Sequence, residues 1–150
     1  FRRVIFGRIT KLITDNKEAL QPPYQKNNTM VHTIHAIMVA NNIALKECRS
    51  LLPSEPIYLD TDELFYKKEE HKFIYFFKYG VIAFYNFDDA EVINQLNAFE
   101  SCLENKLQAP IEAQMEVIYG AEQDKIIDDI IHLKTTCWYS IRTVTFYTVD

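Results

Sequence analysis

The apolar positions along the chain predict an ordered body that begins at Met30. Residues 31–40 are rich in β-branched and small apolar side chains, a composition typical of a strand. Residues 43–52 fit a short helix, which is expected to end before Pro53 because proline does not continue a helix. The body is therefore expected to open with a strand and a helix.

A run of aromatic residues predicts a hairpin in the middle of the chain. Two apolar runs, 73–77 and 81–85, flank the three residues Lys78, Tyr79 and Gly80. We expect two strands joined by a three-residue turn, in which Gly80 takes the positive φ that a bulged hairpin requires. One strand running straight through Gly80 is the alternative. Shorter strand candidates precede the hairpin at 57–59 and 64–66, around the acidic turn 60–62.

A helix is expected after the hairpin. Asp88 and Glu91 have the spacing of a capping box, in which each side chain accepts a hydrogen bond from the backbone N–H of the other. The apolar residues that follow at helical spacing are Val92, Ile93, Leu96, Phe99 and Leu103. Two further strands are expected at 112–119 and 125–134. Strands interrupted by single helices predict the α+β class, with helices packed on a largely antiparallel sheet.

The first 29 residues differ in charge from the rest of the chain. Residues 1–29 carry six Lys or Arg against two acids, whereas residues 30–150 carry ten against nineteen, within a net charge of -5. Because Pro22 and Pro23 separate this basic head from the body, we interpret 1–29 as an extension or linker and 30–150 as a single domain. The head resembles an organelle transit peptide or a membrane-surface helix, but an ordinary surface helix, or sequence upstream of a true start at Met30, fits it as well. A cytoplasmic location is favoured, and a mitochondrial one follows if the head belongs to a transit peptide.

Composition excludes or disfavours several functional classes. The longest apolar runs are far shorter than the roughly 20 residues that a membrane span requires. The three glycines cannot spell a dinucleotide-binding or Walker motif. The acidic body disfavours DNA binding. Cys48, Cys102 and Cys137 lack metal-site spacing, and we interpret them as buried thiols in a reducing compartment.

Two clusters of ionisable residues are candidates for chemistry. His32 and His35 form an H-x-x-H pattern, but on a strand this odd spacing sends the side chains to opposite faces, so a shared metal ion is not expected. Asp128 and His132 would share one face of a strand, and Asp129 would point away. The sequence supplies no nucleophile or oxyanion donor to go with them. We therefore expect no catalytic residues, no metal and no cofactor.

The aromatic density of the central hairpin suggests a second interpretation. Eight of the fifteen residues from 73 to 87 are aromatic, which faintly resembles the RNA-stacking strand of an RNA-recognition domain. The residues that would contact RNA are Tyr75, Phe77 and Tyr85. Because residues on both faces of these strands are apolar, burial in a core under helices is the favoured interpretation.

Three segments, taken in order, carry a family resemblance. These are residues 76–87, the acid-capped helix after Asp88, and residues 128–133. Together they resemble the required-for-meiotic-nuclear-division family, a domain of unknown function, over about residues 30–134. The family-motif positions are Lys78, Tyr79, Gly80, Phe84, Asn86 and Asp129.

The resemblance implies a cellular role but no reaction. No catalytic residues are known for the family, and one eukaryotic branch acts in mitochondria in support of translation. Family members typically continue into a long helical hairpin, often with a hydrophobic anchor, whereas residues 137–149 of this chain have the composition of a strand. We therefore expect membrane association only through family regions that are missing here.

These observations favour a non-catalytic interaction or scaffold domain, which supports translation or an organelle- or membrane-associated assembly. Its partner is expected to be another protein or a second copy of the chain. An RNA-contacting module is the alternative, supported by the aromatic strands and the basic head. A hydrolase that uses the face of Asp128 and His132 is the weakest of the three hypotheses.

Overall fold

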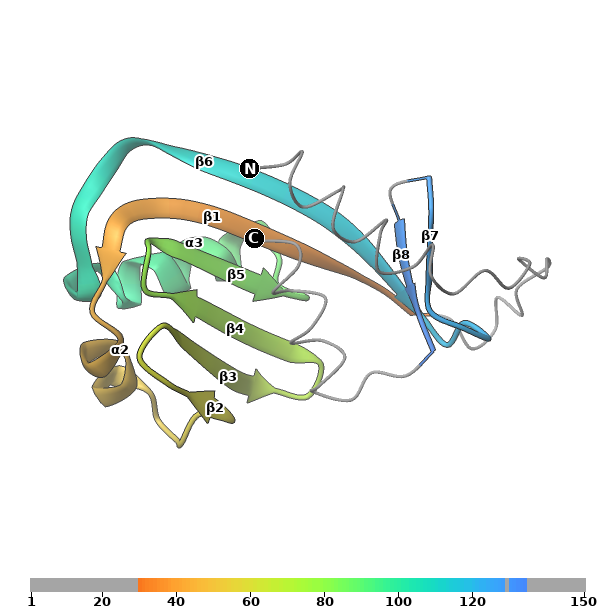
Figure 1. Ribbon diagram of the computed structural model, residues 1–150, viewed down its shortest axis with the longest axis horizontal. Coiled ribbons are helices and arrows are strands. Elements are labelled where there is room, and N and C mark those ends of the chain that lie inside the picture. The colour runs from red at the N-terminus through yellow and green to blue at the C-terminus, as the bar shows by residue number, and fades with distance from the viewer. Residues whose placement is uncertain (1–29, 129, 135–150) are drawn as a thin grey trace. The chain divides into compact units, whose positions relative to one another are not determined.

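The computed structural model describes residues 30–128 and 130–134, and most of these residues lie in β-strands (Figure 1). The described residues form eight strands of one mixed sheet, two α-helices and one short 3-10 helix. Their bounds are β1 Met30–Ile43, α2 Leu45–Leu51, β2 Tyr58–Leu59, β3 Glu63–Glu69, β4 Lys72–Phe77, β5 Val81–Tyr85, α3 Asp89–Ala98, η2 Glu100–Cys102, β6 Leu103–Tyr119, β7 Lys125–Ile127 and β8 Ile130–Leu133. The predicted α+β class is confirmed at this level, with the sheet as the dominant part.

The chain divides into two compact units. The unit His35–Ala113 holds β2 to β5, both α-helices and the adjoining parts of β1 and β6, in the strand order β2-β3-β4-β5-β1-β6. The described part of the other unit, residues 30–34, 114–128 and 130–134, has the order β1-β6-β8-β7. The division into an extension 1–29 and a single domain stays a prediction, because residues 1–29 lie outside the described residues.

The strands pair in both directions. The pairs β2–β3, β3–β4, β4–β5 and β7–β8 are antiparallel, as expected for a largely antiparallel sheet. β6 and β8, however, pair in parallel, with Val117 opposite Ile131. The sheet is therefore mixed, because β7 and β8 form a hairpin that pairs with β6 through its second strand.

The core of the His35–Ala113 unit lies between the central strands and the two helices. Alternate residues of three neighbouring strands face this side: Leu64 and Tyr66 in β3, Ile74 and Phe76 in β4, and Ile82 and Phe84 in β5. The helices contribute Leu45 and Cys48 from α2 and Val92 from α3. The rings of Phe76 and Phe99 meet edge to face, with centroids 4.8 Å apart. This arrangement confirms that the helices pack on the sheet.

The other face of the same strands is also aromatic. Its residues are Phe65, Phe73, Tyr75, Phe77 and Tyr85, and all five are buried. The Tyr75 and Phe77 rings stack at 4.2 Å and those of Phe65 and Phe73 at 5.3 Å. Both faces of β4 and β5 are thus covered, as a near-continuous apolar run in a central strand requires.

The helix α3 starts as the sequence predicts and ends earlier. The Asp88 carboxylate accepts from the Glu91 N–H at 2.8 Å, and the Glu91 carboxylate accepts from the Asp88 N–H at 3.1 Å, which completes the capping box. The predicted apolar stripe extends to Leu103, but Leu103 begins β6. The chain leaves the helix because Phe99 and Cys102 form a 3-10 turn, with the Cys102 N–H bonded to the Phe99 carbonyl at 3.0 Å.

Two strand predictions are corrected. The single strand expected at 125–134 is wrong: Asp128 takes a positive φ of 50° and turns the chain between β7 and β8. Aspartate tolerates this conformation better than most residues, so the turn has a local cause. The strand expected at 112–119 is the second half of β6. Its first half, residues 103–111, is mostly exposed, so it has no apolar alternation that would mark a strand.

Candidate functional site

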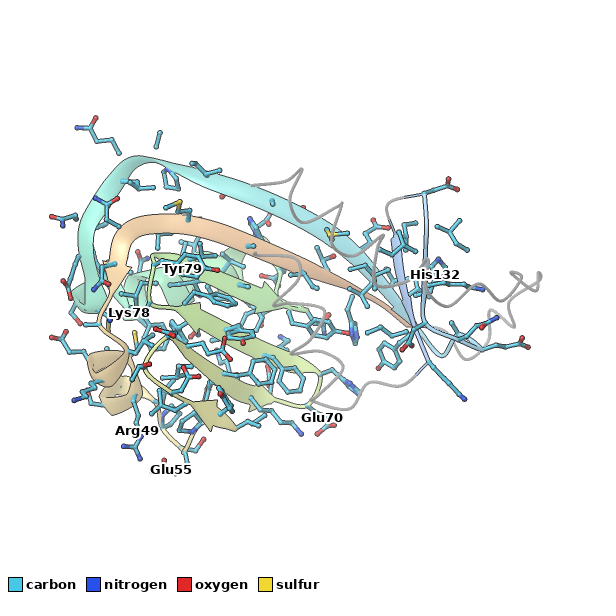
Figure 2. The ribbon with its side chains drawn as sticks, in the orientation of Figure 1. Arg49, Glu55, Glu70, Lys78, Tyr79 and His132 are labelled. Atoms are coloured by element: carbon cyan, nitrogen blue, oxygen red, sulfur yellow. The ribbon has the colours of Figure 1, made fainter. Side chains whose placement is uncertain are left out.

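A pocket opens where β1 meets α2 in the His35–Ala113 unit. It is lined by residues 42–47, residues 59–61 and Lys78, and its volume is about 710 Å³. We call it the Lys78 pocket. Its lining comes from three segments that are distant in sequence: the β1–α2 junction, the turn between β2 and β3, and the hairpin turn between β4 and β5. Figure 2 labels Lys78 at this end of the unit.

Backbone hydrogen bonds hold the three walls of the Lys78 pocket together. The Ile43 N–H donates to the Lys78 carbonyl at 2.8 Å, and the Lys78 N–H donates to the Asp62 carbonyl at 2.8 Å. The Asp60 carboxylate accepts from the N–H groups of Asp62 and Glu63, at 2.8 and 2.9 Å, which fixes the β2–β3 turn. The pocket is therefore formed by a bonded backbone frame rather than by side chains alone.

The lining combines apolar side chains with charges of both signs. Ile43 and Leu45 are buried, and Leu59 has 38% of its surface exposed. The charged lining residues, all exposed, are Lys46, Glu47, Asp60 and Lys78. Such a lining suits one apolar side chain of a peptide. That side chain would leave water for the apolar part of the pocket, and the polar backbone of the peptide would stay next to the charged residues.

The hairpin residues that carry the family resemblance include one with a clear structural role. Gly80 has a φ of 108°, and a Cβ atom there would lie 1.8 Å from the Ala40 carbonyl oxygen. The Gly80 carbonyl accepts from the Val39 N–H at 2.9 Å, so the turn is bonded to β1. The predicted three-residue turn is confirmed, and the alternative of a continuous strand is wrong. Tyr79 is 46% exposed, and its ring lies 5.4 Å from that of Phe77.

Two further motif positions lie in and after β5. Phe84 is fully buried in the core, with its ring 5.4 Å from that of Phe87. Asn86 has a φ of 65°, a conformation that asparagine adopts more readily than most residues, and it redirects the chain toward the α3 cap. Asp129, the last motif position, lies outside the described residues.

The aromatic residues of the RNA hypothesis lie inside the molecule. Tyr75, Phe77 and Tyr85 each expose 1% of their surface or less. A base needs the open face of a ring to stack on, so these three side chains are not accessible to RNA in this conformation.

The acidic and histidine candidates near the end of the described chain do not share a strand face. Asp128 is exposed in the β7–β8 turn, whereas His132 is buried in β8. The expected common face is therefore wrong, because it assumed one continuous strand. Burial lowers the pKa of His132, and the positive charge of Lys125 lowers it further. Lys125 stands opposite His132 in the β7–β8 register.

The two histidines of β1 have separate surroundings. The His32 ring lies 4.9 Å from the Tyr119 ring, and His35 Nε2 lies 3.6 Å from a Glu112 carboxylate oxygen. Among residues 30–128 and 130–134, no three side chains of the ligating types come together in a way that could hold a metal ion.

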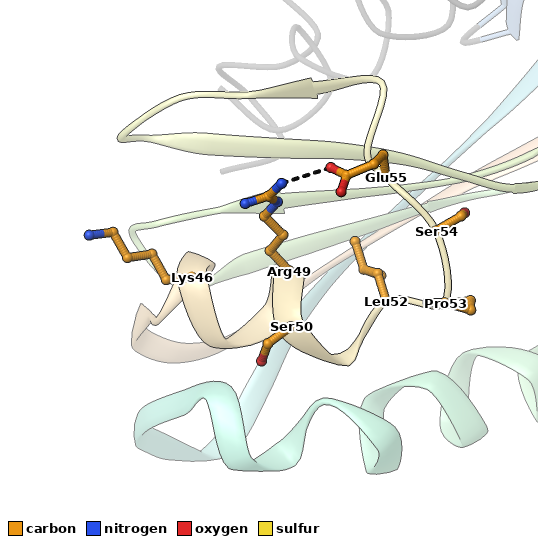
Figure 3. Close-up of a pocket in the computed structure, with 7 residues that line it drawn as sticks. All are labelled: Lys46, Arg49, Ser50, Leu52, Pro53, Ser54 and Glu55. Carbon is orange, nitrogen blue, oxygen red and sulfur yellow. Dashed lines mark hydrogen bonds and ion pairs between the residues drawn. The ribbon is translucent and has the colours of Figure 1, made fainter.

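A second, smaller pocket lies beside α2 (Figure 3). It has a volume of about 420 Å³ and is lined by Lys46, residues 49–50 and residues 52–55. The Arg49 guanidinium donates to the Glu55 carboxylate at 2.8 Å across this pocket. Because its arginine is already paired and its lining is largely polar, this pocket offers a weaker anchor than the Lys78 pocket.

Sequence reasoning singled out only one residue of the Lys78 pocket. Lys78 belongs to the segment that carries the family resemblance, whereas Lys46, Glu47 and Leu59 belong to no motif. The lining runs from Asn42 to Lys78, 36 positions apart in sequence, and comes together through the pairing of strands, which no local pattern reports.

Comparison with known proteins found no family model, no curated protein and no solved structure that matches the chain. In the described part of the chain, neither helix has the length and apolar character needed to cross a bilayer.

Proposed function

We propose that this chain is a non-catalytic protein-interaction domain that captures a peptide segment of its partner in the Lys78 pocket. The observation that carries the proposal is the lining of that pocket, where the apolar side chains of Ile43, Leu45 and Leu59 are framed by charged residues. An apolar anchor set in a polar rim is the usual organisation of a protein-binding surface.

Charge restricts the kind of partner. The pocket rim holds two lysines and two acids, Lys46, Lys78, Glu47 and Asp60, so it offers no concentrated field of one sign. The whole chain carries a net charge of -5. A polyanion such as DNA or RNA is therefore a poor ligand, and a peptide with one large apolar residue between polar neighbours is a good one.

The other two hypotheses have less support. An RNA-contacting role for Tyr75, Phe77 and Tyr85 would require these buried rings to be uncovered first. A hydrolase based on Asp128 and His132 would require side chains from a turn and from a buried strand position to converge on one substrate. We therefore favour a binding function without catalysis.

The cellular setting is part of the same proposal. We propose, from the resemblance of the residues named above, that the chain is related to the required-for-meiotic-nuclear-division family and has a role in support of translation or of an organelle- or membrane-associated assembly. A cytoplasmic location is favoured, or a mitochondrial one if residues 1–29 contain a transit peptide. The partner is another protein, and a second copy of this chain is the alternative.

A peptide-display selection tests the proposal. The full chain is immobilised and offered a library of random linear peptides, with two variants as references. Leu59→Lys places a charge in the pocket lining, whereas Ile93→Lys makes the same change on the exposed face of α3, where Ile93 is 57% exposed. We expect peptides with a large apolar residue to be enriched by the parent and by Ile93→Lys, and not by Leu59→Lys. Equal enrichment by all three proteins, or by none, would overturn the proposal.

A further inference from the structure

Two thiols meet at the junction between α2 and the start of β6. Cys48 lies in α2 and Cys102 ends the 3-10 turn η2; both side chains are fully buried and both are free thiols. The Ala44 N–H donates to the Cys102 carbonyl at 2.9 Å, and the Cys48 N–H donates to the Ala44 carbonyl at 3.1 Å. One helical turn therefore separates Cys48 from the residue that is bonded to Cys102. Both side chains belong to the same buried core cluster, and the Cys102 thiol is close enough to raise the pKa of Cys48.

We propose that Cys48 and Cys102 form a reversible intramolecular disulfide when the protein meets a low-molecular-weight disulfide. One cysteine thiolate attacks the small disulfide, which forms a mixed disulfide and releases one small thiol. The second cysteine thiolate then attacks the cysteine sulfur of that mixed disulfide, which forms the Cys48–Cys102 bond and releases the second small thiol. The two cysteines lose two electrons and two protons, and the small disulfide is reduced to two thiols.

Access to the pair depends on the opening of α2. Burial raises the pKa of the Cys48 thiol well above its ordinary value, and the neighbouring Cys102 thiol raises it further. The closed state is therefore protected from attack. However, α2 has only seven residues, and no side chain caps its N-terminus. A short helix with an uncapped end opens at low cost, and the rate of oxidation then follows that opening.

The disulfide would change the stiffness of a defined part of the fold. It would connect α2 to the residue before β6 and close a loop of about 50 residues, a length at which cross-links generally stabilise the folded state. Residues 44–47 belong both to this junction and to the lining of the Lys78 pocket. The cross-link would thus stiffen one wall of the pocket, and this inference does not depend on what the pocket binds.

The test uses the full chain with Cys137→Ser, which removes the third thiol and leaves the pair intact. The reduced protein is incubated with oxidised glutathione, and its mass and non-reducing peptide map are recorded. We expect a mass loss of two hydrogens with no retained glutathione, a peptide that links Cys48 to Cys102, and full reversal by dithiothreitol. Amide hydrogen exchange in residues 45–51 should slow by about tenfold or more in the oxidised form.

A second variant separates pairing from general thiol reactivity. With Cys48→Ser added, the protein retains only Cys102 and should accumulate a glutathione adduct or remain unreacted, never the loss of two hydrogens. The decisive comparison is between the reduced and the oxidised forms of the Cys137→Ser protein. It therefore does not depend on whether the added Cys48→Ser substitution impairs folding. The proposal is overturned if the Cys137→Ser protein yields stable glutathione adducts, disulfide-linked dimers or no product after prolonged incubation in mild denaturant.

Discussion

Lys72, at the start of β4, donates a hydrogen bond to the carboxylate of Glu91 in the first turn of α3. The same carboxylate caps the helix through the Asp88 N–H, so one side chain joins the helix start to the sheet. Lys72 is also 3.3 Å from Glu69 and lies over the Phe87 ring at 5.7 Å. This contact fixes where α3 begins relative to the core that it covers.

The first prediction follows from this contact. Glu91→Ala removes the ion pair and one half of the capping box, and it should lower the free energy of unfolding by about 1 kcal/mol. Glu91→Gln keeps the acceptor for the Asp88 N–H and should cost less. Chemical denaturation measures both. Glu55→Gln, which removes only the exposed pair with Arg49, serves as the control and should leave stability unchanged.

The same carboxylate predicts a pH dependence. The hydrogen bond from Lys72 is the main cause that holds the pKa of Glu91 below its usual 4.5, with the Asp88 N–H as the next. Its stabilising contribution is therefore complete above pH 4.5 and is lost as the pH falls through the lower folded-state pKa. Denaturation at several pH values below 4.5 should show a shallower loss of stability in Glu91→Gln than in the parent. Parallel curves for the two proteins would contradict this assignment.

A second prediction concerns the turn between β4 and β5. Gly80→Val forces a β-branched residue into a positive φ and places its Cβ against the Ala40 carbonyl, so we expect a loss of at least about 1 kcal/mol. Asn86 also has a positive φ, which glycine adopts more readily than asparagine. Asn86→Gly should therefore change the free energy of unfolding by no more than about 0.5 kcal/mol. Thermal and urea unfolding compare the two. If Gly80→Val were as stable as Asn86→Gly, the strain argument would be wrong.

The third prediction uses the buried histidine of β8. Burial, followed by the charge of Lys125, lowers the pKa of His132 from its usual 6.5, so the unfolded chain takes up the proton more readily than the folded one. The contribution that neutral His132 makes to the free energy of unfolding is then complete above pH 6.5, and it is lost as the pH falls through the lower folded-state pKa. His132→Gln should flatten this part of the stability profile. A His132 resonance that titrates at or above 6.5 by NMR would disprove the shift.

A fourth prediction concerns RNA. Because Tyr75, Phe77 and Tyr85 are buried and the chain is acidic, labelled single-stranded RNA should not saturate the full chain below ~10 μM at ~150 mM salt. Any weak binding should be lost steeply as salt rises and should not change in Tyr85→Leu. Binding that is micromolar or tighter and is abolished by this substitution would favour the RNA-contacting module instead.

Local patterns predicted the elements whose signals are contained within a few residues. The capping box depends on the Asp88 and Glu91 side chains and on backbone N–H groups three residues apart, and the turn at Gly80 depends on the positive φ that glycine adopts readily. The break at Asp128 was missed because the apolar residues on both sides of it read as one continuous strand. The first half of β6 was missed because its residues are mostly exposed on both faces, so they show no alternation.

The candidate site depended on information that sequence patterns do not contain. Lys78 is placed against the Ile43 and Asp62 backbone by strand order, and that order follows from the packing of the whole sheet. The proximity of Cys48 and Cys102 is equally non-local, because it arises where α2 packs against η2. The sequence predicts three buried thiols. The structure confirms the burial of Cys48 and Cys102, and Cys137 lies outside the described residues.

The central claim is that the Lys78 pocket binds an apolar peptide anchor, and isothermal titration calorimetry tests it most directly. A peptide selected on the parent chain is titrated into the parent, Leu59→Lys and Ile93→Lys. We predict micromolar binding to the parent and to Ile93→Lys, and at least about tenfold weaker binding to Leu59→Lys, because only that change puts a charge in the apolar lining. Equal affinity for the parent and Leu59→Lys, with loss of binding in Ile93→Lys, would place the binding surface on α3 and contradict the proposal.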